Sequence, residues 1–525
     1  MQNLAGNIYF IAVIAVIGGA LFGFDISSMS AIISTQPYLC QFNQRGFDEN
    51  GRCLGPTDAV QGGITAAMPG GSWLGALVSG FLSDSYGRKR SIQIGSVIWV
   101  IGSILVCTSV NIPMLVLGRI INGFSVGICS AQVPVYISEI SPPSKRGRLV
   151  GFQQWAITWG ILIMYFICYG SAYMKTSAAF RVPWGIQMIP AILLFLGLCI
   201  LPESPRWLAK HDRWDETTEV LTMIHGKGDP NSPFVHHELL EIREVVEFER
   251  ANADVSFREL FAPKMINRTI IGVFTQIWSQ LTGMNVMVSL KHNLLPLERL
   301  LTSFICQMYY ITYVFTMAGL AGDSDTAVLL PSGINFVINV IMTVPALLWM
   351  DRWGRRPTLL VGAFLMCLWL CVNAGIFAIY SRPPLPGEFT STAESMAVSG
   401  APAKAIIAST YLFVASFAPT WGPVSWTYPP ELYPLRLRGK AVALCTSANW
   451  AFNFALAYFV PPAFAQITWK TYVLFATFCA AMFLHVFFMF PETANKPLEE
   501  VEKIFDDTQA GGKSYRLFGI CTCKT

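Results

Sequence analysis

Long apolar runs separated by short polar segments dominate the pattern along this chain. Residues 95–114, 151–169 and 359–380 are three runs that carry no charged side chain. Runs near 20 residues are long enough to cross a hydrocarbon core of about 30 Å as helices. Only helices and closed barrels span a membrane, and these runs lack the alternation of barrel strands. The pattern therefore predicts an all-α membrane protein.

The runs predict twelve transmembrane helices, six on each side of a polar stretch. The first six are 8–34, 59–82, 91–110, 113–137, 149–171 and 183–201. The second half gives 266–287, a disturbed region to about 318, and then 327–350, 358–380, 404–428, 440–466 and 469–490. We therefore divide the chain into an N-terminal six-helix bundle (1–201), a linker (202–265), a C-terminal six-helix bundle (266–490) and a tail (491–525). Amphipathic stretches at 214–224 and 238–250 predict helices in the linker.

Composition and the placement of charge add the orientation. Hydrophobic residues make up 53% of the chain and charged residues 13%, against about 25% charged in soluble proteins. Basic clusters at 88–90, 145–148, 352–356 and 436–440 fall in alternate loops. Positively charged loops stay on the cytoplasmic side, so we place these loops, the linker and both termini there. The N-terminus lacks a basic n-region, and we expect the first apolar run to be retained.

Three sequence pairs recur in the same order in the two halves. The string Asp84–Arg90 recurs as Asp351–Arg356, and Pro202–Ser204 recurs as Pro491–Thr493. Between these two motifs in each half, Glu139 followed by Arg146 and Arg148 recurs as Glu431 followed by Arg436 and Arg438. Duplicated halves predict two bundles that rock around a central path, opening to each side of the membrane in turn.

Together these motifs resemble the sugar porter family of the major facilitator superfamily, and fungal hexose transporters in particular. The matching strings are Gly87–Arg90, Gly118-Arg119, Pro134–Glu139, Pro202–Leu208, Gln276–Asn285, Asp351–Arg356, Trp421–Trp426 and Pro491–Thr493. The match covers nearly the whole chain. It implies the major facilitator fold, a monosaccharide substrate and transport by alternating access.

One carboxylate falls inside the first apolar run. A charge at membrane depth costs several kcal/mol unless it is paired or protonated, so Asp25 needs a partner. Arg119 is the basic residue at a similar depth in the first half. Such a pair can take up a proton when it separates and lose it when it closes. In proton-coupled relatives the matching positions do this. The alternative is a static pair, which some facilitators retain.

Sugars present many hydroxyls, which suit amides and indoles within a membrane protein. The resemblance implies a substrate site made of Gln154, Gln276, Gln280, Asn285, Asn335, Trp421, Trp426 and Asn449. Ile161, seven residues after Gln154, lies on the same helix face and would add an apolar wall. An isolated intramembrane glutamine more often joins two helices than binds a ligand. Six amides at family-matching positions favour the sugar site. The resemblance also implies gating roles for Tyr309 and Tyr310. Pro423, Pro429 and Pro430 interrupt the tenth span, and we expect a bend there to serve gating.

Charges of both signs flank the cytoplasmic helix ends. We expect them to form an interdomain latch that holds the outward-open state and breaks on the reverse swing. Its members are Asp84, Arg88, Glu139, Arg146, Glu203, Arg206, Asp351, Arg355, Glu431, Arg438 and Glu492. The alternative is charge that only sets topology, which explains the arginines but not the glutamates.

Residues 288–307 interrupt the family pattern. In relatives the string that ends here at Met287 runs directly into a tyrosine pair, whereas here Tyr309 and Tyr310 follow this extra segment. Its residues, VSLKHNLLPLERLLTSFICQ, read like a translated intron that keeps the frame. We interpret the segment as a retained intron, and a genuine regulatory insertion is the alternative.

Outside the spans, Cys40 and Cys53 share the first extracellular loop, where an oxidising environment permits a disulfide. The sequence thus predicts a plasma-membrane, multi-pass symporter that imports glucose or another hexose, or xylose, with a proton. Its partners are the sugar, the proton and the lipid bilayer. Alternatives are a facilitative uniporter, a porter for quinate or a disaccharide, and a non-transporting sugar sensor. We expect no enzyme activity, cofactor, metal or nucleic-acid partner, because the sequence lacks the motifs for them.

Overall fold

The computed structural model describes most of the chain. It covers residues 6–251 except 34, 48–50, 52, 227 and 230–231, and residues 257–284 except 264. It also covers residues 329–381, 398, 400–494 except 468, and residues 501 and 505. Asn285, Tyr309, Tyr310 and the segment 288–307 lie outside the described residues. Within that coverage, regular structure is helical apart from one bridge between Phe47 and Cys53.

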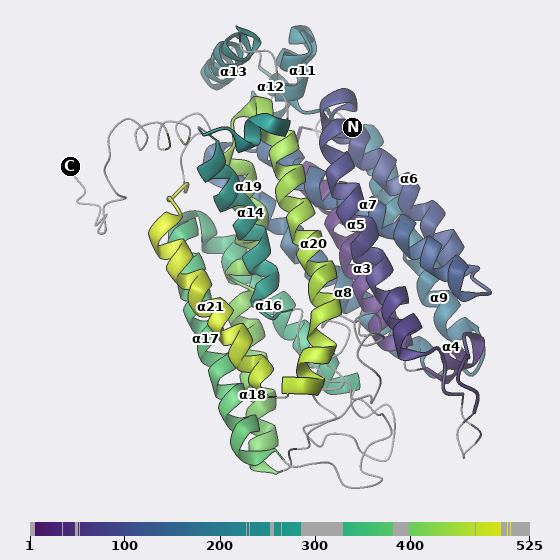
Figure 1. Cartoon of the computed structure of the whole chain (residues 1–525). Helices are drawn as coiled ribbons and strands as arrows, with labels where there is room; N and C mark the ends of the chain where they lie inside the picture. The colour runs from purple at the N-terminus through teal and green to yellow at the C-terminus, as the bar shows by residue number, and fades with distance from the viewer. Residues whose placement is uncertain are drawn as a thin grey trace.

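The first half forms six helical segments across the bundle (Figure 1). They are α2 (Ile8–Ala15) with α3 (Ile17–Ile32), α5 (Asp58–Tyr86), α6 (Arg88–Cys107), α7 (Ile112–Ile140), α8 (Arg146–Ser171), and α9 (Ala178–Ile186) with α10 (Met188–Ile200). Two predicted spans are therefore each built from two consecutive helices, which meet at Val16 and at Gln187. Two short elements, α4 (Gln36–Gln41) and η1 (Pro143–Lys145), lie in loops.

The linker forms helices at one end of the bundle (Figure 1). They are α11 (Pro205–Lys210), α12 (Trp214–Ile224), α13 (Pro233–Ala251) and the short η2 (Phe257–Phe261). The predicted bounds of α12 are confirmed. The apolar faces of α11, α12 and α13 pack together through residues that include Leu221, Val235 and Ile242, which is how amphipathic helices bury their apolar stripe.

The described residues of the second half form six further segments. They are α14 (Ile266–Leu281), α16 (Leu329–Trp353), α17 (Arg355–Tyr380), α18 (Ala401–Phe417) with α19 (Trp421–Leu432), α20 (Leu435–Ile467) and α21 (Lys470–Met489). The sequence places the interruption of the tenth span at its prolines. Instead, the break falls before Pro423, between Phe417 and Trp421, at a further proline, Pro419. Pro423 then sits in the first turn of α19, where a missing N–H costs little.

Small residues bring helices into close contact inside the first half. Gly75 of α5 faces the Phe124 carbonyl of α7, and Gly123 of α7 faces the Met68 carbonyl of α5. A Cβ at either glycine would collide with that backbone oxygen. Close approach at small residues is the usual means of packing helices within a membrane.

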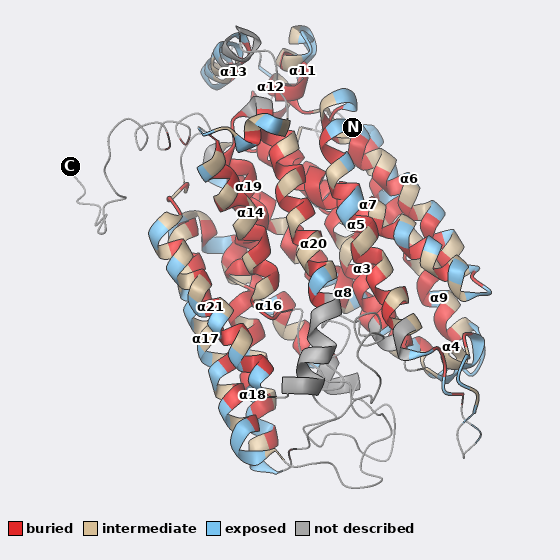
Figure 2. Ribbon diagram, viewed as in Figure 1, coloured by how far each residue is buried: buried red, intermediate tan, exposed pale blue. Residues whose placement is uncertain are grey.

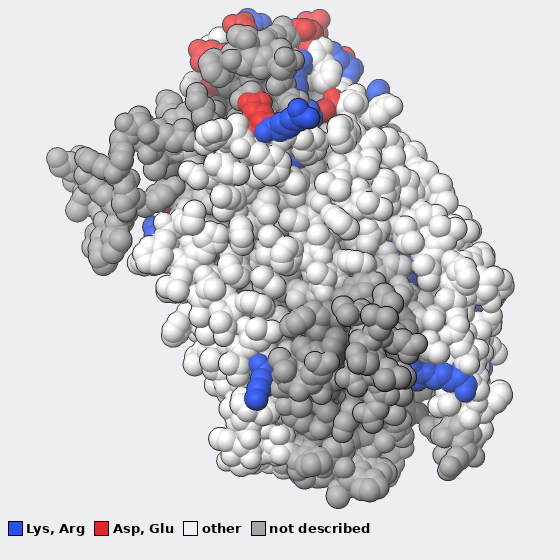
Figure 3. Space-filling model, in the orientation of Figure 1, with Lys and Arg blue, Asp and Glu red and all other residues white. Residues whose placement is uncertain are grey.

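The outer surface of the bundle is apolar. Figure 2 shows exposed positions on the outer faces of the helices, and these include large apolar side chains such as Phe81, Ile101 and Phe364. In the view of Figure 3 the side of the bundle is largely uncharged, whereas Lys, Arg, Asp and Glu gather at the end with the linker helices. Nine helices among the described residues are long and apolar enough to cross a membrane. The chain is thus an all-α, multi-pass membrane protein.

Candidate transport site

The buried ion pair joins the first and fourth spans. Arg119 Nη2 lies 3.3 Å from Asp25 Oδ2, and each residue exposes 1% of its surface. Arg119 Nε also donates a hydrogen bond to the Ile64 carbonyl of α5, at 2.8 Å. The guanidinium is therefore held by a backbone oxygen as well as by the carboxylate. If the pair separates, the carboxylate loses its counter-charge in an apolar setting and favours the protonated form.

Amides from α14 and α20 form a connected group in the second half. Gln280 Nε2 donates to Asn449 Oδ1 at 2.7 Å, and Asn453 Nδ2 donates to Gln280 Oε1 at 3.1 Å. Ser279 Oγ lies 3.3 Å from the same Asn449 oxygen. Four residues apart on α20, Asn449 and Asn453 share a face. Ser279 and Asn453 were not among the predicted site residues. The four-residue spacing from Asn449 is a sequence signal that could have identified Asn453.

Two further predicted residues join the halves across the centre. Trp426 of α19 donates its indole N–H to Gln154 Oε1 of α8 at 3.0 Å. Ile161, seven residues after Gln154, lies in the same apolar cluster as Trp426 and Phe336. Asn335, next to Phe336 on α16, is buried. These contacts bring Gln154, Ile161 and Trp426 together.

The remaining predicted positions show different contacts. Gln276 of α14 donates from Nε2 to the Ser425 carbonyl of α19 at 2.8 Å, so its amide ties two helices of the second half. Trp421 donates its indole N–H to the Leu359 carbonyl of α17 at 2.9 Å, and its ring packs in the core of that half. The structure therefore does not bring Trp421 to the amides.

Several buried polar atoms at the centre have no hydrogen-bond partner within the described residues. They include the side-chain oxygens of Gln276 and Asn335 and the Asn449 Nδ2. A buried polar group without a partner costs about 1–3 kcal/mol. Two acceptors and one donor left open at a central position suit a ligand with several hydroxyls, since a hydroxyl both donates and accepts.

Several charges of the predicted latch in the first half form one compact cluster. Arg88 binds Glu139 through two bonds of 2.9 Å, and Ser204 Oγ donates to the same carboxylate. Glu203 accepts the backbone N–H groups of Arg88 and Lys89 at the start of α6. A carboxylate at a helix N-terminus is favourable. Even so, burial raises the pKa of the Glu203 carboxyl above its ordinary value, although the N–H groups of Lys89 and Ser204 and the Arg88 charge act to lower it.

The second half repeats this cluster. Arg355 binds Glu431 at 2.7 and 3.1 Å, and Thr493 Oγ1 donates to the same carboxylate at 2.6 Å. Glu492 accepts the N–H groups of Arg355 and Arg356 at the start of α17. The sequence repeats therefore correspond to the same contacts in space.

Fewer bonds cross between the halves. Lys440 Nζ lies 3.6 Å from Asp84, and Arg438 Nη1 lies 3.9 Å from Glu139. A third contact between the halves is a hydrogen bond of 3.0 Å from the backbone N–H of Arg148, on α8, to Asp351 Oδ2. Arg206 pairs with Glu238 inside the linker, and Arg146 is buried at the start of α8. The residues predicted to form the latch thus lie mainly in two clusters within the halves, with a few contacts between the clusters.

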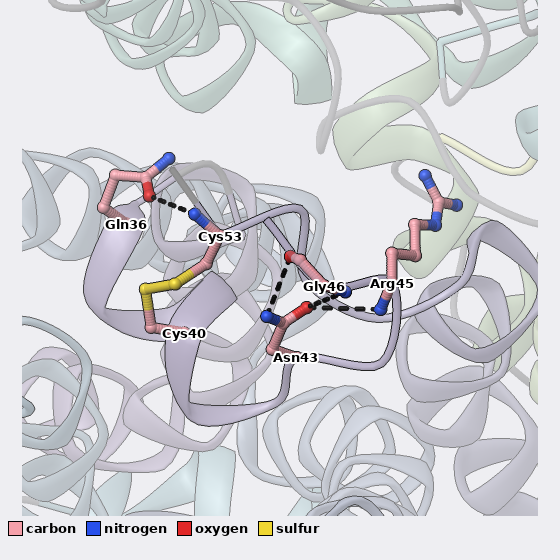
Figure 4. Close-up of a disulfide and its surroundings, with 6 residues drawn as sticks. All are labelled: Gln36, Cys40, Asn43, Arg45, Gly46 and Cys53. Atoms are coloured by element: carbon pink, nitrogen blue, oxygen red, sulfur yellow. Dashed lines mark hydrogen bonds between the residues drawn. A yellow bond between two sulfur atoms is a disulfide. The ribbon is translucent and has the colours of Figure 1, made fainter. Parts of the chain in front are cut away.

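The loop between α3 and α5 is closed by a disulfide. Cys40 is bonded to Cys53, with their Cα atoms 5.1 Å apart (Figure 4). Beside it, Gln36 accepts the Cys53 N–H, and Asn43 caps a turn through Arg45 and Gly46.

Two paired bundles, a buried ion pair and a central group of amides define a membrane transporter of the major facilitator class. The family model for sugar (and other) transporters matches residues 11–305 and 294–505. The MFS glucose transporter mfs1 of Aspergillus flavus is 46% identical over 510 residues, which cover 95% of this chain and 90% of that protein. A high-affinity glucose transporter of Kluyveromyces lactis is 44% identical over 504 residues, with 95% and 85% covered. The chain belongs to this sugar transporter family, and it is a transporter rather than an enzyme.

Solved structures agree with this assignment. The proton:xylose symporter XylE bound to 6-bromo-6-deoxy-D-glucose matches with a TM-score of 0.75 at 26% identity, covering 95% of this chain and 99% of XylE. The inward-open conformation of XylE from E. coli matches less closely, with a TM-score of 0.63 at 26% identity and the same coverage.

Proposed function

We propose that this protein imports a monosaccharide together with a proton, with glucose or another hexose as the main substrate and xylose as a second. The proposal is carried by two observations together, the buried amides Gln154, Gln280 and Asn449 and the buried Asp25–Arg119 pair. The names of the relatives support it, since two are glucose transporters and the structural relative is a proton:xylose symporter.

The mechanism starts from a conformation closed toward the cytoplasm. The cross-links Lys440–Asp84 and Arg148–Asp351 hold the cytoplasmic helix ends together, and the closer match to sugar-bound XylE supports this assignment. A proton on Asp25 frees Arg119, and a sugar bound between Gln154 and the α14–α20 amides draws the halves together. Rocking then breaks the cross-links and releases both solutes inside.

We also propose a plasma-membrane location with both termini in the cytoplasm. The described ends support a shared side, because Gly6 lies against Met223 of the linker and Phe505 lies under Arg268 at the start of α14. Residues 288–307 are proposed to be a retained intron. The family match divides near this segment, since its two parts overlap at residues 294–305. Sequencing of the transcript tests this interpretation: an abundant message that contains the segment would refute it.

Uptake of labelled glucose into proteoliposomes tests the function, using chains with and without residues 288–307. An inward proton gradient should drive glucose above its equilibrium level, and unlabelled xylose should compete. If glucose only equilibrates across the membrane and the proton gradient has no effect, the protein is a facilitative uniporter with a static Asp25–Arg119 pair. Quinate competing better than any hexose would replace the proposed substrate.

A further inference from the structure

One indole of the second half lies inside the core of the first half. Trp450, on α20, is fully buried, and its ring belongs to an apolar cluster with Met68, Val126 and Val133 of the first half. Phe22 of α3 meets this ring edge-on, with the ring centroids 4.7 Å apart. Trp450 therefore fills space between the halves, directly next to Asn449 of the amide group.

The indole is fixed there by a bond that crosses between the halves. Trp450 Nε1 donates to Ser130 Oγ of α7 at 3.1 Å, while that hydroxyl lies 3.2 Å from the Gly127 carbonyl, which can accept its proton. The Ser130 carbonyl in turn lies 3.4 Å from Gln153 Nε2, one residue before Gln154. A buried indole N–H needs an acceptor, so this arrangement specifies one relative position of the halves.

We infer that Trp450 is the central gate of the transport path and that its bond to Ser130 holds the path closed toward the cytoplasm. Separation of the cytoplasmic helix ends moves α20 away from α7, which breaks the bond and withdraws the ring from Phe22. Because Asn449 and Trp450 are consecutive, a sugar that engages Asn449 shifts the gate directly. The inference rests on the proposed alternating-access transport, and its test is separate from sugar uptake.

The test measures how often the cytoplasmic side opens. Ala443 of α20 is fully buried, and a Cβ on Gly80 of α5 would lie 3.1 Å from its side chain, so it marks the interface between the halves. In inside-out vesicles, a water-soluble maleimide should label Ala443→Cys only when this interface opens. The same proteins without Ala443→Cys give the background from native cysteines. Ser130→Ala and Trp450→Phe each delete the bond, and a third protein carries both substitutions.

The matched control is Ser125→Ala on the same helix. Its hydroxyl binds the Gly95 carbonyl inside the first half at 2.6 Å, so its loss leaves the interface intact. We expect Ser130→Ala to speed labelling about three- to tenfold, the equivalent of one hydrogen bond. Trp450→Phe should speed it at least as much, because it also loses packing of the indole, and the double variant should label no faster than Trp450→Phe alone. Ser125→Ala should label at the parent rate.

Three results would overturn the gate. They are an unchanged rate in Ser130→Ala, an equal increase in Ser125→Ala, and multiplied effects in the double variant. Should Trp450→Phe fail to fold, Ser130→Ala against Ser125→Ala still decides the question. Labelling needs no sugar, so absence of sugar uptake by the parent protein would count against the proposed function and not against the gate.

Discussion

The buried Arg88–Glu139 pair gives a prediction with a calculable size. The Glu139 side chain has no exposed surface, and its carboxylate takes both bonds from Arg88. Arg88→Met keeps the bulk of the side chain but leaves a buried carboxylate whose nearest other cation is Arg438, at 3.9 Å. Removing one partner of a buried pair costs about 3–5 kcal/mol. Because Arg438 offsets part of this cost, we expect Arg88→Met to lower the free energy of unfolding by about 3 kcal/mol.

The apparent melting temperature of the detergent-solubilised protein measures this loss. A domain the size of one half loses about 2–4 °C for each kcal/mol, so Arg88→Met should melt about 6–12 °C lower. Adding Glu139→Leu removes the stranded charge as well and should recover more than half of the loss. The double variant should nevertheless transport poorly, because the cross-link from Arg438 to Glu139 is also gone.

Arg90→Met is the control, because Arg90 lies two residues away and is exposed. A surface substitution of this kind changes stability by about 0.5 kcal/mol or less. The reasoning is refuted if Arg88→Met melts within 2 °C of the control, about one kcal/mol, or if the double variant melts no higher than the single one.

Three further predictions concern the site, the interface and the linker. Gln154→Ala, which also strands the Trp426 indole, should raise the KM for glucose about fivefold, and an unchanged KM in uptake assays would place the sugar elsewhere. In Gly147→Ala the new Cβ would collide with Asp351 and Arg355 across the interface, so cytoplasmic labelling of Ala443→Cys should rise. Gly170→Ala on the same helix, with nothing within 4 Å, should label at the parent rate. Burial lowers the pKa of His225, so the folded protein resists its protonation. Its contribution to docking of α12 is therefore complete above about pH 6.5 and declines as the pH falls below that value. Hydrogen exchange of α12 should show this decline in the parent protein and a flat profile in His225→Gln.

The hydrophobic pattern predicted the helices well and their interruptions poorly. Apolar runs specify what a membrane requires of a span, whereas breaks at Val16 and Gln187 depend on tertiary packing. The break at 418–420 contains Pro419, and a proline disfavours the interior of a helix. The repeated motifs predicted the matching charge clusters because each half folds to the same plan. They did not show that Arg88–Glu139 and Arg355–Glu431 close within a half, since the partner of a charge is a property of the assembled bundle.

The contacts within the predicted sugar site likewise depend on the assembled bundle. Gln154 and Trp426 meet although 272 residues separate them, and no local periodicity indicates such a pair. Trp421 and Trp426 belong to one motif, yet five residues place them about 140° apart around a helix. One therefore faces Gln154 while the other faces the Leu359 carbonyl. Trp450 was not predicted to be a functional residue, because a tryptophan within an apolar run usually packs in the core.

Sugar-induced proton uptake tests the central claim most directly. Transporter-null cells expressing the chain without residues 288–307 are given glucose in a weakly buffered medium, with Asp25→Asn as the comparison. The account predicts that glucose makes the medium of the parent cells alkaline, and that Asp25→Asn abolishes this change while the protein still reaches the membrane. Entry of labelled glucose with no alkalinisation in the parent cells would contradict it, because the Asp25–Arg119 pair would then be structural and the transport uncoupled from protons.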